Sequence, residues 1–72
     1  EDEEDAEVKV SARGTPSLTR RGLDLSVVMR EASKAVGGDG GGHNVAAGAT
    51  VPKGTEDEFV ALADELVGEQ LD

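Results

Sequence analysis

"GGDGGGHNVAAGAT", residues 37–50, joins two different patterns. Five glycines fall within its first six positions, and the single histidine of the chain, His43, follows directly. A flexible linker can begin in this way, but it has no reason to continue into apolar residues at every second position up to Val51. That alternation predicts a strand over 45–51, ended by Pro52. The glycine run before it is either slack between two elements or a surface that brings a ligand against the backbone.

Upstream of this stretch, the sequence predicts a strand followed by a helix. Residues 7–13 (EVKVSAR) alternate between apolar and polar side chains, which is typical of a half-buried strand. From Leu25 the apolar residues recur at intervals of three and four through Val36, as on one face of an amphipathic helix. Asp24 is placed to cap the start of this helix, and Gly37 to end it in a left-handed turn.

Downstream, residues 55–71 predict a second helix. Thr55 and Glu58 have the spacing of a capping box at its start. Helical periodicity then places the large apolar side chains on one face, which is expected to pack on the core. The residues of that face are Phe59, Leu62, Ala63 and Leu66.

The order strand–helix–strand–helix predicts an α/β fold. Two strands joined through a helix are expected to lie parallel, with a right-handed crossover. We therefore expect a small strand–helix–strand–helix module with a parallel strand pair, as part of a larger mixed sheet. Because two strands alone make a poor sheet, the remainder comes either from a longer chain or from a short strand within residues 15–22.

Charge is distributed unevenly along the 72 residues. The net charge is −9, yet residues 1–7 and 54–72 hold thirteen acids and no base, whereas residues 8–53 carry a net charge of +4. The glycine run lies in this basic middle, so the overall acidity does not exclude an anionic ligand. We expect residues 1–6 to be a flexible acidic segment and residues 7–72 to be the folded domain. The acid excess indicates adaptation to high salt.

Composition excludes several classes of protein. The chain has no cysteine, and therefore neither a disulfide framework nor a thiolate metal site. No apolar run approaches the ~20 residues of a membrane span, and the acidic start is unlike a signal peptide. We expect a cytoplasmic protein with no membrane partner. A single histidine without a cluster of further ligands cannot build a catalytic metal site, so no catalytic residue and no metal ligand is assigned.

The glycine run does not fit the common nucleotide-binding motifs. A P-loop or dinucleotide fingerprint follows a strand and opens a helix, whereas these glycines follow a helix and precede a strand. Two interpretations stay open from the residues alone. The run is a flexible turn beside a surface histidine, or successive glycines turn their N–H groups inward as an anion-binding nest with His43 at its lip.

Three stretches together resemble one known family. VKVSARG at residues 8–14, a helix beginning after Asp24, and GGGHNVAAGA at residues 40–49 are similar to the C-terminal DHH-associated domain of DHH-family phosphoesterases. The RecJ-like single-strand-specific exonucleases are the members that it resembles in particular. The resemblance covers residues 7–71, and with the acidic composition it indicates an origin in a salt-adapted archaeon.

The resemblance implies a substrate-binding role, in which the glycine–histidine loop and the strand arginine meet a phosphate or sugar of single-stranded DNA or RNA, or of a short oligonucleotide. Catalysis, with manganese or magnesium, would belong to a separate DHH domain that partners this one, and this chain itself would need no cofactor. Asn44 stands where many relatives have proline. The residues to which the resemblance assigns substrate binding are Ser11, Arg13, Gly40, Gly41, Gly42 and His43.

Two alternatives to the exonuclease remain at this stage. One is an RNA-binding or protein-interaction module of the kind appended to alanyl-tRNA synthetases. The other is the substrate domain of a phosphodiesterase that acts on nucleotides rather than on polymers.

Overall fold

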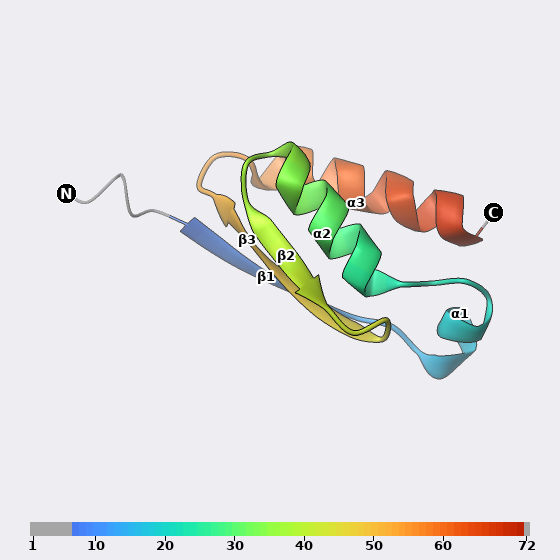
Figure 1. Ribbon diagram of the computed structural model, residues 1–72. Helices are drawn as coiled ribbons and strands as arrows, with labels where there is room; N and C mark the ends of the chain where they lie inside the picture. Colours follow the sequence, from blue (N-terminus) through green and yellow to red (C-terminus); the bar gives the residue numbers. More distant parts are fainter. Residues whose placement is uncertain (1–6, 72) are drawn as a thin grey trace.

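The computed structural model describes residues 7–71, and the predicted flexible segment 1–6 lies outside them. Figure 1 shows two layers, a three-stranded sheet with α2 and α3 on one of its faces. Among the described residues, no helix is both long and apolar enough to cross a bilayer. The elements in chain order are β1 (Glu7–Arg13), α1 (Pro16–Arg20), α2 (Leu25–Ala35), β2 (Asp39–Gly42), β3 (Ala46–Pro52) and α3 (Glu56–Leu71).

The strand order is β1–β3–β2, and both neighbouring pairs are antiparallel. The predicted parallel pairing of residues 7–13 with 45–51 is therefore wrong, because these segments pair antiparallel, with Val10 opposite Ala49. The cause is an unforeseen strand, β2, which the glycine run itself forms. The chain crosses through α2 from β1 to β2, and these two strands run in the same direction with β3 between them. Residues 15–22 hold α1 rather than a hidden strand.

The glycine run can form a strand because β2 lies directly against the backbone of α2. A Cβ at Gly40 would come within 2.4 Å of the carbonyl oxygen of Met29 and 2.8 Å of the hydroxyl of Ser33. A residue with a side chain would push the strand and the helix apart. Within β2 only Gly42 has a positive φ, +138°. The run is thus extended, and the nest of successive positive-φ glycines is not formed.

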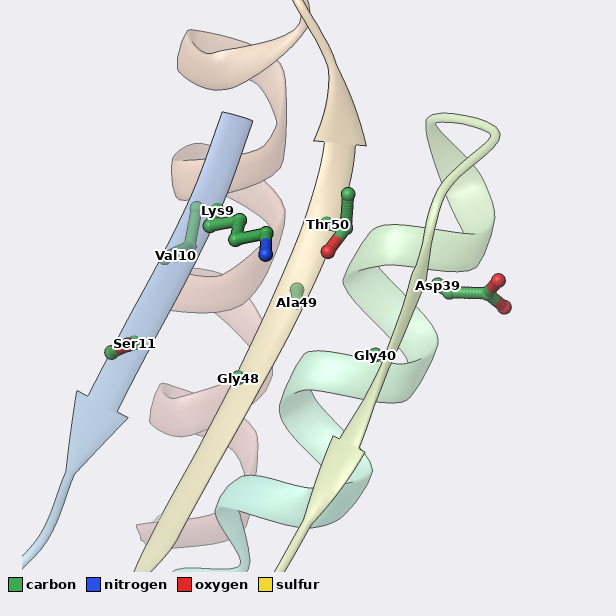
Figure 2. A pocket seen from close by; sticks show the side chains of 8 residues that line it. All are labelled: Lys9, Val10, Ser11, Asp39, Gly40, Gly48, Ala49 and Thr50. Carbon is green, nitrogen blue, oxygen red and sulfur yellow. The ribbon is translucent and has the colours of Figure 1, made fainter. Parts of the chain in front are cut away.

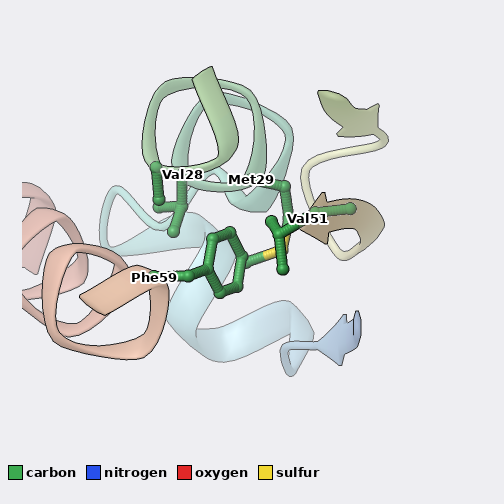
Figure 3. Packing of buried hydrophobic residues seen from close by; sticks show 6 residues of the cluster. Val28, Met29, Val51 and Phe59 are labelled. Atoms are coloured by element: carbon green, nitrogen blue, oxygen red, sulfur yellow. The ribbon is translucent and has the colours of Figure 1, made fainter. Parts of the chain in front are cut away.

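The hydrophobic core lies between the sheet and the two long helices. Figure 3 shows Phe59 of α3 packed among Val28 and Met29 of α2 and Val51 of β3, and each of these side chains is at most 3% exposed. Alanines of α2 and β3 complete the buried cluster. Because the cluster draws on both helices and on the central strand, burial of its apolar surface holds the two layers together.

The ends of α2 follow the prediction, whereas the cap at the start of α3 differs from it. The Asp24 carboxylate accepts hydrogen bonds from two backbone N–H groups of the first turn of α2, at 3.1 and 3.4 Å. Gly37, just beyond the other end, has a φ of +86°. Before α3, the Thr55 hydroxyl donates to the carbonyl of Pro52 at 2.7 Å. The capping box predicted with Glu58 therefore does not form.

Candidate functional site

The face of the sheet opposite the helices is open (Figure 1). Along β1, Lys9, Ser11 and Arg13 are exposed and alternate with half-buried residues that pack toward the helices. Residues opposite each other on neighbouring strands place their side chains on the same face, so the register extends this open face across β3 and β2. The rows it forms are Lys9–Thr50–Asp39, Ser11–Gly48–Gly41 and Arg13–Ala46.

His43 continues the last of these rows. Its backbone N–H donates to the carbonyl of Ala46 at 2.8 Å, and the N–H of Ala46 donates back to the carbonyl of His43 at 3.2 Å. Arg13 is opposite the same alanine on the other side. With neighbouring strands ~4.8 Å apart, the Cα atoms of Arg13 and His43 are ~10 Å apart. Because β1 and β2 run in the same direction, their C-terminal ends bring these two exposed residues to one end of the sheet.

The three glycines assigned to the site by resemblance do not share one environment. A Cβ at Gly41 would meet nothing within 4 Å, so this glycine leaves the open face bare. Gly40 points to the other face, against α2. A Cβ at Gly42 would lie 2.7 Å from the Cα of Ala47, and its positive φ is one that side chains rarely adopt. Gly41 is therefore accessible to a ligand, whereas Gly40 and Gly42 shape the strand.

The turn that follows His43 is held from two directions by backbone hydrogen bonds. The carbonyl of Asn44 accepts from the N–H of Leu25, the first residue of α2, at 3.0 Å. The carbonyl of Val45 accepts from the N–H of Gly14, directly after β1, at 2.9 Å. The end of β1 with Arg13 and the end of β2 with His43 are therefore fixed relative to each other.

A side chain of α3 supports this anchorage from the helix layer. The Oε1 of Gln70 accepts from the backbone N–H of Asp24 at 2.8 Å, and its Nε2 donates to the Asp24 carbonyl at 3.1 Å. Asp24 in turn caps α2, whose first N–H holds the turn after His43. The C-terminal end of α3 is thus connected to the candidate site through the side-chain amide of Gln70 and the backbone groups of Asp24, Leu25 and Asn44.

The Asp24 carboxyl has a pKa below its ordinary value. The main cause is the hydroxyl of Ser26, which donates to the carboxylate, and the backbone N–H groups of Val27 and Ser26 add to it. Each of these donors favours the charged form. The capping carboxylate is therefore ionised over the physiological range.

Two shallow hollows follow one another along the open face. One, of about 520 Å³, lies between Lys9 and Thr50 and is drawn in Figure 2. The other, of about 300 Å³, lies between Arg13 and Gly41. Both include Ser11 and Gly48, whose row separates them.

Sequence reasoning missed the contributions of Lys9, Thr50 and Gly48 to this face. The alternation of residues 7–13 places Lys9 on the outward side of the strand with Ser11 and Arg13, but no role in the site was assigned to it. Gly48 and Thr50 alternate with the apolar residues of the strand predicted over 45–51, so their face could have been inferred in the same way, whereas their place opposite β1 depends on the register. That register is antiparallel, where a parallel one was expected.

Within residues 7–71, no group of three or more histidine, cysteine or acidic side chains comes close enough together to hold a metal ion. The described residues therefore do not fit a manganese or magnesium centre. What the open face does offer is two cationic side chains, hydroxyl groups and a floor without side chains.

The chain is a two-layer α/β domain with one free sheet face. It belongs to the DHHA1 domain family, which its sequence matches over residues 1–69. The resemblance to a DHH-associated domain is thereby confirmed. An uncharacterized protein of Methanocaldococcus jannaschii is 56% identical to it over 63 residues. That alignment covers 88% of this chain and 14% of the relative, so the chain spans about a seventh of that protein's length.

Proposed function

We propose that the open sheet face binds the sugar–phosphate backbone of single-stranded nucleic acid or of a short oligonucleotide. In this proposal the domain holds the substrate for a RecJ-like phosphoesterase, and a separate DHH domain supplies the metal ions and the hydrolysis. The observation that carries the proposal is the row in which Arg13 and His43 flank Ala46 at one end of a bare, glycine-floored face.

The chemistry of that row suits a phosphodiester. Arginine presents a planar fork of N–H donors that matches two phosphate oxygens, and such charge-assisted hydrogen bonds are among the strongest in proteins. The exposed imidazole of His43 adds a donor about two strand spacings away. Ala46 between them and Gly41 in the neighbouring row are small, so a ribose or deoxyribose ring can approach the backbone of the sheet.

The distribution of charge supports the same face. α3 carries six acids and no base and lies in the helix layer. Lys9 and Arg13 instead project from the open face. α3 therefore repels an anionic strand, whereas the Arg13 end of the open face attracts one, because the acids of that face, Glu7 and Asp39, lie at its other end.

The test is the affinity of the full-length protein that carries this domain for a single-stranded DNA or RNA oligonucleotide, without divalent metal so that the strand is not cleaved. We expect Arg13→Ala to weaken binding roughly 10- to 100-fold, the scale of one charge-assisted hydrogen bond. His43→Ala should weaken it by a smaller factor. The control is Arg30→Ala, which removes an exposed arginine of α2 from the helix layer. Wild-type affinity in both the Arg13 and the His43 variant would refute the proposal.

A further inference from the structure

We propose that the hollow between Lys9 and Thr50 is a second cationic phosphate subsite beside that at Arg13, so that the open face holds three consecutive phosphates of a single strand lying along β1, with the middle one at Ser11. This inference rests on the proposed function, because it assumes that a first phosphate is bound at Arg13. It deepens that function by naming the ligand as a strand of at least four nucleotides rather than a mononucleotide or dinucleotide.

The spacing of the exposed side chains of β1 is the first argument. Lys9, Ser11 and Arg13 stand at every second residue of one strand. Such positions are ~6.7 Å apart, which is close to the distance between neighbouring phosphates in an extended single strand. Lysine, serine and arginine are all common donors to phosphate oxygens. The three side chains therefore form a track with one donor for each phosphate.

The second argument is the shape of the hollow at the Lys9 end. Figure 2 shows the Lys9 side chain leaving β1 and reaching toward Thr50 of β3, whose side chain is turned toward it. The hollow of about 520 Å³ that these two residues help to line has Gly48 in its floor. An ammonium group and a hydroxyl thus face each other at a hollow whose floor includes a residue without a side chain.

Acidic groups define where the track ends. Asp39 belongs to the same row as Lys9 and also lines the hollow, but Figure 2 shows its carboxylate directed outward from β2, away from the lysine. Glu7, opposite Pro52, occupies the next exposed position of β1 beyond Lys9. A fourth phosphate in line would meet the Glu7 carboxylate. The face is therefore suited to three phosphates and not to a longer run along this strand.

The experiment compares two ligands in the full-length protein without divalent metal. One is a dinucleotide with a single internucleotide phosphate, and the other is a tetranucleotide with three, each in the thymidine and the uridine series. Lys9→Gln should weaken tetranucleotide binding about three- to tenfold and reduce the salt dependence by about one phosphate contact. Dinucleotide binding should change less than about twofold, because a lone phosphate occupies the Arg13 end. Thr50→Val should act in the same direction with a smaller factor.

Lys34→Gln is the matched control, because it makes the same charge change at an exposed position of α2. Equal losses for both ligands in Lys9→Gln, or no loss for either, would overturn the second subsite. If Arg13→Ala also left both ligands bound as in the wild type, the proposed function itself would fail. If Arg13→Ala weakened both ligands while Lys9→Gln weakened neither, the function would stand and the second subsite would be rejected.

Discussion

Gly40 and Gly41 are neighbours in one short strand, yet they belong to opposite faces of the sheet with opposite demands. On the helix face, Gly40 is required because the backbone of α2 occupies the place of its Cβ. On the open face, Gly41 has nothing within 4 Å of that position. The same residue type serves close packing on one side and access for a ligand on the other. Residue type alone therefore could not assign either role, whereas the face of the sheet on which each position lies does assign it.

β1 shows the same division with different residues. Its helix-facing side chains, Val8, Val10 and Ala12, pack against the core cluster. Its other side chains are exposed, polar or charged, and form the candidate site. The two faces of the sheet should consequently respond differently to substitution, with loss of stability on one and loss of binding on the other.

The largest effect is expected at Gly40. In Gly40→Ala the new Cβ meets the carbonyl oxygen of Met29 at 2.4 Å, and helix backbone cannot move aside as a flexible side chain can. We expect the free energy of unfolding to fall by about 3 kcal/mol, at the upper end of overpacking effects. Urea denaturation measures it. Gly41→Ala is the matched control and should cost less than about 1 kcal/mol. Equal stabilities of the two variants would break the contrast between the faces.

The next effect concerns binding on the open face. Gly41→Val places a branched side chain on the bare floor, where its Cβ meets nothing within 4 Å. A β-branched residue is well tolerated in a strand, so the fold should be retained. We expect at least a tenfold loss of oligonucleotide affinity, about 1.4 kcal/mol, measured by fluorescence anisotropy. Unchanged affinity in a folded variant would show that the ligand does not lie over this part of the sheet.

A smaller effect should follow from the contact between the helix layer and the site. Gln70→Ala removes both hydrogen bonds to the backbone of Asp24. We expect a loss of about 1–2 kcal/mol in stability and faster hydrogen exchange at the amide of Leu25, which holds the turn after His43. Glu69→Ala, at the exposed neighbouring position, is the control. If exchange at Leu25 were as slow as in the wild type, the turn would be held without help from α3.

The smallest effect is a change in the pH dependence of stability. The pKa of Asp24 is lowered in the folded state from its ordinary value of 3.8 by the donors at the start of α2. The unfolded chain therefore takes up this proton more readily, and the stabilisation is lost as the pH falls from about 3.8 through the lowered value. Asp24→Asn keeps an oxygen that can cap the helix but does not titrate.

The difference in unfolding free energy between wild type and Asp24→Asn should accordingly shrink as the pH falls through that range. Chemical denaturation at a series of pH values gives this difference directly. A difference that stays constant below pH 3.8 would mean that the cap does not depend on the charge of Asp24.

The sequence by itself determined those helices and strands in which apolar side chains recur at a regular spacing. Alternation defined β1 and β3, the spacing of apolar residues defined α2 and α3, and Asp24 marked the start of α2. The same alternation placed Ser11 and Arg13 on the outward side of their strand. The stretch GGGHNVAAGA was sufficient to indicate the family.

Only the tertiary structure decided the third strand, the antiparallel order and the composition of the open face. Glycine has no side chain, so the run at residues 39–42 carries no alternation that could reveal a strand. Its strand exists because β3 supplies hydrogen bonds and α2 approaches closely, and neither interaction leaves a side-chain period within residues 39–42. That strand reverses the expected pairing of β1 with β3. For the same reason it brings His43 to the end of the sheet where Arg13 stands.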